Sequence, residues 1–316
     1  MPRLNIVAVM LCVLVLVACK KDEHKVSEPA YLHLDRMDVV GRQDNTAIVN
    51  EGFYTSNIDA VQLIAYWEGD AAETELGTFQ LPCTVPVLSC DTITRLNIVP
   101  IVKQNGISAT RIEYPYYEYI TLENVPLKTD SITNLGEKDS TGLYALHTTY
   151  RPWTTNLSST SDTLVKVLAE EYFEAIQFSI SFSDKVDRLT NSDLVRSGTG
   201  SGVVNVPDTV SMLEFEIEDE IICNDPTAYL YLEMDYKTDV MMSVGMRSSY
   251  RSGGTEDTQS AITLYASPEW KKIYINLGRL WAQFNHNANF HVVFAALNSE
   301  KTGGKIYLDN VKLLQL

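Results

Sequence analysis

The sequence has little of what most catalytic sites use. Only five histidines occur in 316 residues, and none lies at metal-ligand spacing from a cysteine. The signatures GxSxG, HExxH and GxxxxGK[ST] are missing, and no helix-forming run follows the Gly-rich residues 197–202, which predict a turn rather than a phosphate cradle. Carboxylates are abundant, and the sequence does not reveal whether two of them lie in one cleft at the separation that a glycosidase needs. We therefore expect no enzyme, with a glycan-active enzyme as the weaker alternative.

Basic residues are also scarce. The chain has 25 Lys and Arg against 41 Asp and Glu, which gives a formal net charge of −16. A surface of this sign repels nucleic acids and anionic lipids. We expect no nucleic-acid partner, and solubility alone accounts for the acidity.

Long apolar runs are confined to the N-terminus, where residues 4–18 are apolar except for Asn5. This run is shorter than the roughly twenty residues that a bilayer-spanning helix needs. Arg3 precedes it, and Ala18 and Cys19 end it. A short positive segment, an apolar stretch and a small residue before the cleavage point are typical of a signal peptide, so residues 1–18 are expected to be removed.

The quartet Leu16-Val17-Ala18-Cys19 resembles the lipobox of bacterial lipoproteins. The resemblance implies a diacylglycerol on the sulfur of Cys19 and an acyl chain on its amine, which together anchor a protein stably to a membrane. Lys20 stands where enterobacterial inner-membrane lipoproteins carry Asp, and residues 20–23 resemble the export signal of surface lipoproteins in Bacteroidota. We expect an outer-membrane protein that faces the cell surface, with residues 19–30 as a tether; the leaflet stays open.

Three cysteines remain once the leader and the lipidated residue are set aside, namely Cys83, Cys90 and Cys223. An odd number leaves at least one thiol free in an oxidising compartment. Cys83 and Cys90 are close enough in sequence to close a short loop as a disulfide. Both that pairing and the state of Cys223 stay open.

The first half of the expected mature chain alternates with the period of two that is typical of β-strands. Val61, Leu63 and Ala65 share one face of such a segment, and Asn105-Gly106 is a strong two-residue hairpin turn. Residues 31–127 are predicted to form a β-sandwich of immunoglobulin-like or transthyretin-like size. The polar, turn-rich residues 128–142 are predicted to be a linker.

The second half, residues 143–316, is predicted to be a jelly-roll sandwich. Leu213, Phe215 and Ile217 alternate with glutamates, as in an antiparallel sheet with one wet face, and further strand patterns recur between turns. Only two segments have helical spacing. Residues 162–176 are ambiguous and are expected to lead into the first jelly-roll strand, whereas residues 277–284 predict one or two helical turns.

The stretches EWKKIYINL and IYLDNVKL carry most of a resemblance to the galactose-binding-like jelly roll that many carbohydrate-binding modules use. The resemblance covers roughly residues 165–316. The whole chain resembles two-domain Bacteroidota lipoproteins of unassigned function. These resemblances imply a fold class, all-β with two sandwiches, and a compartment, but no substrate.

Jelly rolls of this kind often hold a structural Ca²⁺ between their first and last strands, through hard oxygen ligands. Asp309 lies on the apolar face of the closing strand pattern, where an unpaired carboxylate would be costly. Glu171 and Glu174, near the opening strand, are the candidate companions. The alternative is that Asp309 accepts hydrogen bonds from the backbone or from arginine.

Several aromatic residues are candidate contacts for a ligand or a partner. Trp153 lies in a polar context, and Tyr117 and Tyr119 share a face of the tyrosine-rich stretch 114–119, whereas Trp270 is expected in the core. Tyrosine clusters fill domain interfaces or bind proteins, and both interpretations stay open.

The sequence thus favours a lipid-anchored, non-catalytic protein that recognises a protein partner, as an accessory subunit of an outer-membrane assembly, secretion or motility complex. The alternative is a carbohydrate-binding surface lipoprotein for glycan capture. An apolar patch of several hundred Å² would favour the partner. Two or three exposed aromatics ringed by polar groups would favour the glycan.

Overall fold

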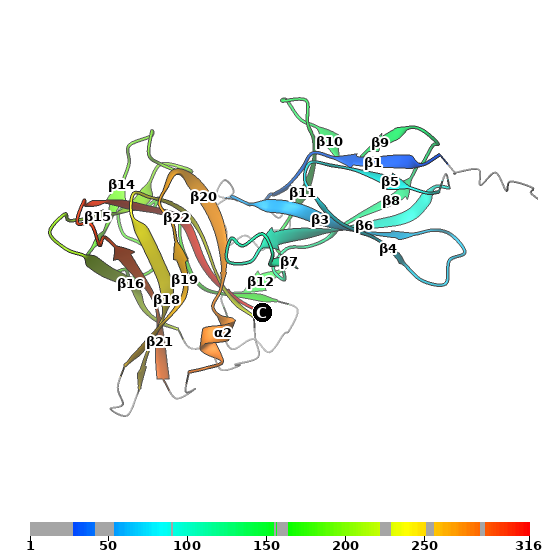
Figure 1. The fold of residues 1–316 in the computed structure, drawn as a ribbon. Helices are drawn as coiled ribbons and strands as arrows, with labels where there is room; N and C mark the ends of the chain where they lie inside the picture. The colour runs from blue at the N-terminus through cyan, green and yellow to red at the C-terminus, as the bar shows by residue number, and fades with distance from the viewer. Residues whose placement is uncertain are drawn as a thin grey trace, which may run out of the picture.

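The computed structural model describes residues 28–41, 54–89, 91–154, 156, 164–221, 229–250, 256–284 and 288–316. In this part of the chain nearly all regular structure is β-strand, with one short helix, α2 (Gly278–Trp281). Two β-sandwich lobes lie side by side (Figure 1): the N-terminal lobe runs from β1 to β11 and the C-terminal lobe from β12 to β22. The predicted all-β fold with two sandwiches is confirmed. None of the described helices is long and apolar enough to cross a bilayer.

The N-terminal lobe packs a five-stranded sheet against two small three-stranded sheets. Its core includes Val61, Leu63 and Ala65, the residues whose alternation predicted a buried strand face. The large sheet consists of β4 (Thr74–Gln80), β3 (Ile58–Tyr66), β6 (Ile93–Lys103), β7 (Arg111–Glu113) and β8 (Ile120–Val125). The small sheets consist of β5 (Cys83–Val87), β1 (Ala30–Leu34) and β9 (Ile132–Asn134), and of β10 (Glu137–Lys138), β11 (Tyr144–Thr148) and β2 (Arg36–Val39).

The linker predicted over residues 128–142 is instead part of the N-terminal lobe. Its strand β9 pairs in parallel with β1, and its strand β10 pairs with β11, which in turn pairs with β2. Backbone groups make these pairs, so polar side chains do not prevent them. The polarity of the segment correctly indicated an exposed surface but did not indicate the edge strands that it completes.

The C-terminal lobe packs a seven-stranded sheet against a four-stranded sheet, with a large apolar core between them. Leu213 lies at the edge of that core, and Phe215 and Ile217 lie within it, as their alternation predicted. The seven-stranded sheet consists of β12 (Trp153–Thr154), β13 (Val165–Glu171), β22 (Gly304–Gln315), β15 (Ser201–Val206), β14 (Val186–Leu189), β17 (Leu230–Thr238) and β20 (Ser267–Asn276). The four-stranded sheet consists of β16 (Met212–Ile221), β21 (Ala288–Leu297), β18 (Met241–Tyr250) and β19 (Asp257–Leu264).

The two segments with helical spacing differ in outcome. Residues 277–284 contain the single-turn helix α2, as predicted. The ambiguous segment contains β13, which pairs with the closing strand β22 across a register shift between Val167 and Ala169. The helical spacing of its apolar residues arises because that irregularity places Val167 and Ala169 in different core clusters.

The N-terminal lobe covers the outer face of the seven-stranded sheet. Tyr231, Tyr274 and Leu314 project from β17, β20 and β22 into the core cluster of the N-terminal lobe. The hairpin turn between β6 and β7, predicted from Asn105 and Gly106, docks onto β20. There the N–H of Asn105 donates to the carbonyl of Tyr274 at 2.8 Å, and Oδ1 of Asn105 accepts from the N–H of Asn276 at 2.9 Å.

Candidate functional site

The tyrosine-rich stretch between β7 and β8 lies buried between the two lobes. Tyr114, Tyr116 and Tyr117 are at most 5% exposed. The ring of Tyr114 contacts those of Tyr231 and Tyr274 across the boundary, at centroid distances of 5.5 and 4.7 Å. Burial raises the pKa of Tyr114 and Tyr117 well above the usual tyrosine value. Tyr114, Tyr116 and Tyr117 therefore pack between the lobes, whereas Tyr119 of the same stretch is 56% exposed.

Charged side chains are buried beneath these rings. Glu233 is fully buried and accepts hydrogen bonds from the hydroxyls of Tyr114 at 2.7 Å and Tyr150 at 2.6 Å. Its carboxylate also lies 3.3 Å from Nζ of Lys272. Nζ of Lys312 lies over the ring of Tyr150 at 5.1 Å, and burial lowers the pKa of this lysine to about 8. This network holds the lobes together and offers a ligand no access.

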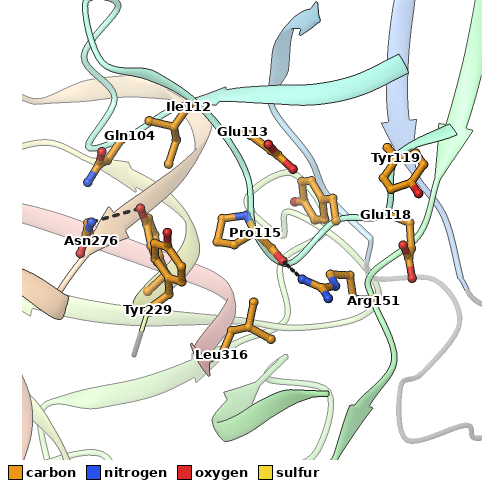
Figure 2. A pocket seen from close by; sticks show the side chains of 12 residues that line it. Gln104, Ile112, Glu113, Pro115, Glu118, Tyr119, Arg151, Tyr229, Asn276 and Leu316 are labelled. Carbon is orange, nitrogen blue, oxygen red and sulfur yellow. Dashed lines mark hydrogen bonds between the residues drawn. The ribbon is translucent and has the colours of Figure 1, made fainter. Parts of the chain in front are cut away.

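A cleft of about 570 Å³ opens where the lobes meet beside this interface (Figure 2), within the size range of small-ligand sites. Tyr119 and Tyr229 line its two sides and are each 56% exposed. Pro115 lies between them, and its carbonyl accepts a hydrogen bond from Arg151 at 3.3 Å. We call this region the tyrosine cleft.

Both lobes supply the walls of the tyrosine cleft. The N-terminal lobe contributes side chains from the ends of β6 and β7 and from the segment before β8, and the C-terminal lobe contributes the start of β17, the end of β20 and the C-terminal residue. The polar members are Gln104, Glu113, Glu118, Arg151 and Asn276.

The polar groups of the tyrosine cleft are planar amides, carboxylates and a guanidinium. Nδ2 of Asn276 donates to the hydroxyl of Tyr231 at 3.1 Å, and burial raises the pKa of Tyr231 to about 12. Planar groups with fixed donors and acceptors suit a ligand that carries several hydroxyls. Exposed aromatic faces at the same place suit a ligand that also has apolar faces. Two carboxylates and one guanidinium line the cleft, so it has no excess of positive charge that would favour an anionic ligand.

The structure brings two of the three predicted aromatic contacts together. Tyr117 and Tyr119 both line the tyrosine cleft, although Tyr117 is nearly buried and its hydroxyl lies 3.0 Å from that of Tyr274. Trp153 lies elsewhere, half-buried in β12, where it stacks on Tyr150 at 5.8 Å. Sequence reasoning missed Tyr229, which no local pattern distinguishes from a strand residue.

The three carboxylates predicted to hold Ca²⁺ each have separate partners. Glu171 accepts backbone N–H groups of Tyr172 at 2.9 Å and Phe173 at 2.5 Å. Glu174 accepts the N–H of Thr199 at 2.9 Å, within the Gly-rich turn. No cluster of three metal-ligating side chains forms among residues that the structure describes.

Asp309 follows the alternative that its sequence allowed. It accepts hydrogen bonds from Oγ of Ser201 at 2.8 Å and from the N–H of Ser197 at 3.2 Å and of Asn310 at 2.7 Å. Burial raises its pKa to about 7. The strand carries a bulge here, with Asn310 at φ 48°, and the carboxylate is buried in polar surroundings.

The predicted cysteine chemistry lies largely outside the described residues, which do not include Cys19, Cys90 or Cys223. Cys83 is half-buried in β5, and burial raises the pKa of its thiol. The lipid anchor and the Cys83–Cys90 disulfide stay predictions.

No protein-family model matches the chain, and no curated protein matches it. Solved structures with a similar arrangement of strands include carbohydrate-binding modules. The family 11 module from Clostridium thermocellum, in complex with a β-1,3-1,4-mixed-linked tetrasaccharide, is 14% identical with a TM-score of 0.34, over 47% of this chain and 94% of its own. TmCBM61 in complex with β-1,4-galactotriose is 16% identical with a TM-score of 0.30, over 45% and 93%. A xylan-binding domain from CBM 22 is 11% identical with a TM-score of 0.35, over 46% and 93%.

Proposed function

We propose that the protein is a lipid-anchored, non-catalytic glycan-binding protein of the bacterial outer membrane, and that the tyrosine cleft binds a neutral oligosaccharide. The observation that carries the proposal is the pairing of two half-exposed tyrosines, Tyr119 and Tyr229, with five planar polar side chains in one cleft.

The chemistry of a sugar ring matches both parts of this cleft. A pyranose has apolar C–H faces and an equatorial rim of hydroxyls. The faces stack on an aromatic ring, which presents apolar surface at low cost in conformational entropy. Each hydroxyl can both donate and accept a hydrogen bond. It can therefore pair with the amides of Gln104 and Asn276 and donate to the carboxylate of Glu113.

The comparisons are consistent with this choice over a protein partner. The modules named above were solved with a mixed-linked tetrasaccharide and with a galactotriose, or are named for xylan. The proposal for this chain rests on its own cleft, which those matches do not describe. Within the tyrosine-rich stretch, Tyr114 and Tyr116 are completely buried, whereas Tyr119 is exposed and lines the tyrosine cleft.

The mechanism is capture without reaction. The lipid on Cys19 confines the protein to the membrane surface, and the tether holds the lobes clear of the headgroups. A bound glycan chain is thereby kept at the cell surface. Mass spectrometry of the mature N-terminus tests the anchor: an acylated Cys19 supports it, and an unmodified cysteine with residues 1–18 still attached contradicts it.

Isothermal titration calorimetry with neutral β-linked trisaccharides tests the site. Tyr229→Ala removes one exposed ring, and Tyr265→Ala is the matched control because Tyr265 is 77% exposed and does not line the cleft. Loss of one stacking contact is expected to weaken binding about tenfold. No binding of any neutral glycan, together with stoichiometric co-purification of an integral outer-membrane protein, would favour the protein-partner function instead.

A further inference from the structure

A second pocket, of about 400 Å³, also lies on the boundary between the lobes. It adjoins the same β6–β7 hairpin turn that reaches the tyrosine cleft: Gln104 lines the cleft, whereas Lys103 and Gly106 line this pocket. The C-terminal lobe contributes the first half of β20 and the loop before β15. We call it the basic pocket.

Four cationic side chains line the basic pocket, and no carboxylate is among its described lining residues. They are Lys103, Arg196, Lys271 and Lys272. This concentration stands out in a chain with a formal net charge of −16. A concave site lined by one sign of charge raises the local concentration of ligands of the other sign.

The carboxylates that pair with these cations lie behind the pocket wall. Nζ of Lys103 lies 3.0 Å from Asp59, which Arg111 also contacts at 2.8 Å. Nε of Arg196 lies 3.2 Å from Asp235. The side chain of Lys272 is 1% exposed, and its Nζ has a carboxylate oxygen of Glu233 at 3.3 Å but no hydrogen bond of good geometry.

The charges of this group do not cancel. Of the four cations that line the pocket, Lys103, Arg196 and Lys272 each face a carboxylate, those of Asp59, Asp235 and Glu233. The excess of one positive charge is carried by Lys271, which is exposed. The pocket therefore has room for an anionic group that the protein itself does not supply.

The remaining lining groups are those of a sugar site. Trp270 is half-buried in β20 and is held edge-on by Tyr307, at a centroid distance of 6.3 Å. Ser56, Asn57 and Tyr236 add hydroxyl and amide groups. An inorganic anion needs the cations alone, whereas an indole beside hydroxyl and amide groups matches the ring of a sugar.

We infer that the basic pocket binds an acidic sugar residue, with its carboxylate on Lys271 and Arg196 and its ring against Trp270. The choice of a sugar rests on the proposed function; the choice of an anion rests on the pocket alone. The chain would then bind acidic glycans at one flank of the β6–β7 turn and neutral ones at the other.

Calorimetric titration of the full mature chain with tri-galacturonate tests this inference, with carboxyl-reduced tri-galacturonate as the neutral probe. Lys271→Glu reverses one charge of the pocket at an exposed position, so the fold is kept. Lys128→Glu makes the same change at an exposed lysine that does not line the pocket. Lys271→Glu is expected to weaken tri-galacturonate binding at least tenfold, Lys128→Glu less than twofold, and added salt should weaken it in the wild type.

The outcomes separate the two pockets. Equal tri-galacturonate affinities of the wild type and Lys271→Glu would overturn the inference, as would binding of sodium sulfate without any binding of tri-galacturonate. Tri-galacturonate binding that survives Tyr229→Ala but not Lys271→Glu supports the basic pocket even where neutral glycans do not bind. Neutral-glycan binding lost only in Tyr229→Ala supports the tyrosine cleft by itself.

Discussion

At the scale of single residues, burial decides the behaviour of Asp309. The sequence pattern placed this carboxylate on an apolar strand face, and the structure buries it there, hydrogen-bonded within a bulge. What the sequence could not provide was the donor set, because Ser197 and Ser201, the latter at the start of β15, lie about a hundred residues earlier in the chain. Glu171 and Glu174 likewise have hydrogen-bond partners of their own, separate from those of Asp309.

The raised pKa of Asp309 predicts a pH dependence of stability. Its pKa is about 7 in the folded protein against 3.8 in a free side chain, so the folded state holds the proton more tightly. The stabilisation from this group is fully present below pH 4 and is lost as the pH rises towards 7. Asp309→Asn should therefore flatten the fall in melting temperature between pH 4 and pH 7.

The comparison is made as the difference between wild type and variant, because other carboxylates titrate in the same range. Asp187→Asn, an exposed carboxylate on β14, is the control. A parallel pH profile for wild type and Asp309→Asn would contradict the assignment.

At the scale of elements, local patterns predicted strands well where one face is buried and one is wet. The alternation of Leu213, Phe215 and Ile217 and the Asn105-Gly106 turn carry their information within a few residues. Edge strands such as β9 and β10 carry no such pattern, because their pairing depends on a partner strand distant in sequence. The same limit concealed Tyr229, which lines one cleft together with Tyr119 from the other lobe.

The docking turn makes a prediction of its own. Gly106 has φ 67°, a left-handed conformation that costs other residues about 1–2 kcal/mol. Added at Gly106, a Cβ atom would meet only Ile273 at 3.5 Å, an ordinary contact. Gly106→Ala should therefore lower the free energy of unfolding by about 1–2 kcal/mol from backbone strain alone. Ser108→Ala in the same turn is the control, and equal melting temperatures for the two variants would contradict this account.

At the scale of the whole molecule, the arrangement of the lobes was beyond the sequence. The strands β17, β20 and β22 carry aromatic and charged residues between their core residues, and that pattern predicts a wet outer face. The N-terminal lobe covers this face, so Tyr231, Glu233 and Tyr274 are buried. Both pockets are lined by residues of the two lobes together.

Glu233 is expected to be critical for the packing of the two lobes against each other. Glu233→Gln removes the charge that faces Lys272 and so leaves a buried ammonium group without its nearest partner. Breaking such a pair costs about 3–5 kcal/mol, whereas an exposed pair contributes at most about 1 kcal/mol. Glu73→Gln, which breaks the exposed pair with Arg95, is the matched control. Scanning calorimetry that finds equal losses for the two variants would refute a central role for Glu233.

The most direct measurement is a crystal structure of the mature protein soaked with a neutral oligosaccharide that it binds in calorimetry. The account predicts a sugar ring in the tyrosine cleft, stacked on Tyr229 or Tyr119 and hydrogen-bonded to Asn276, Gln104 or Glu113. A sugar bound on another surface, with the tyrosine cleft filled only by water, would contradict it.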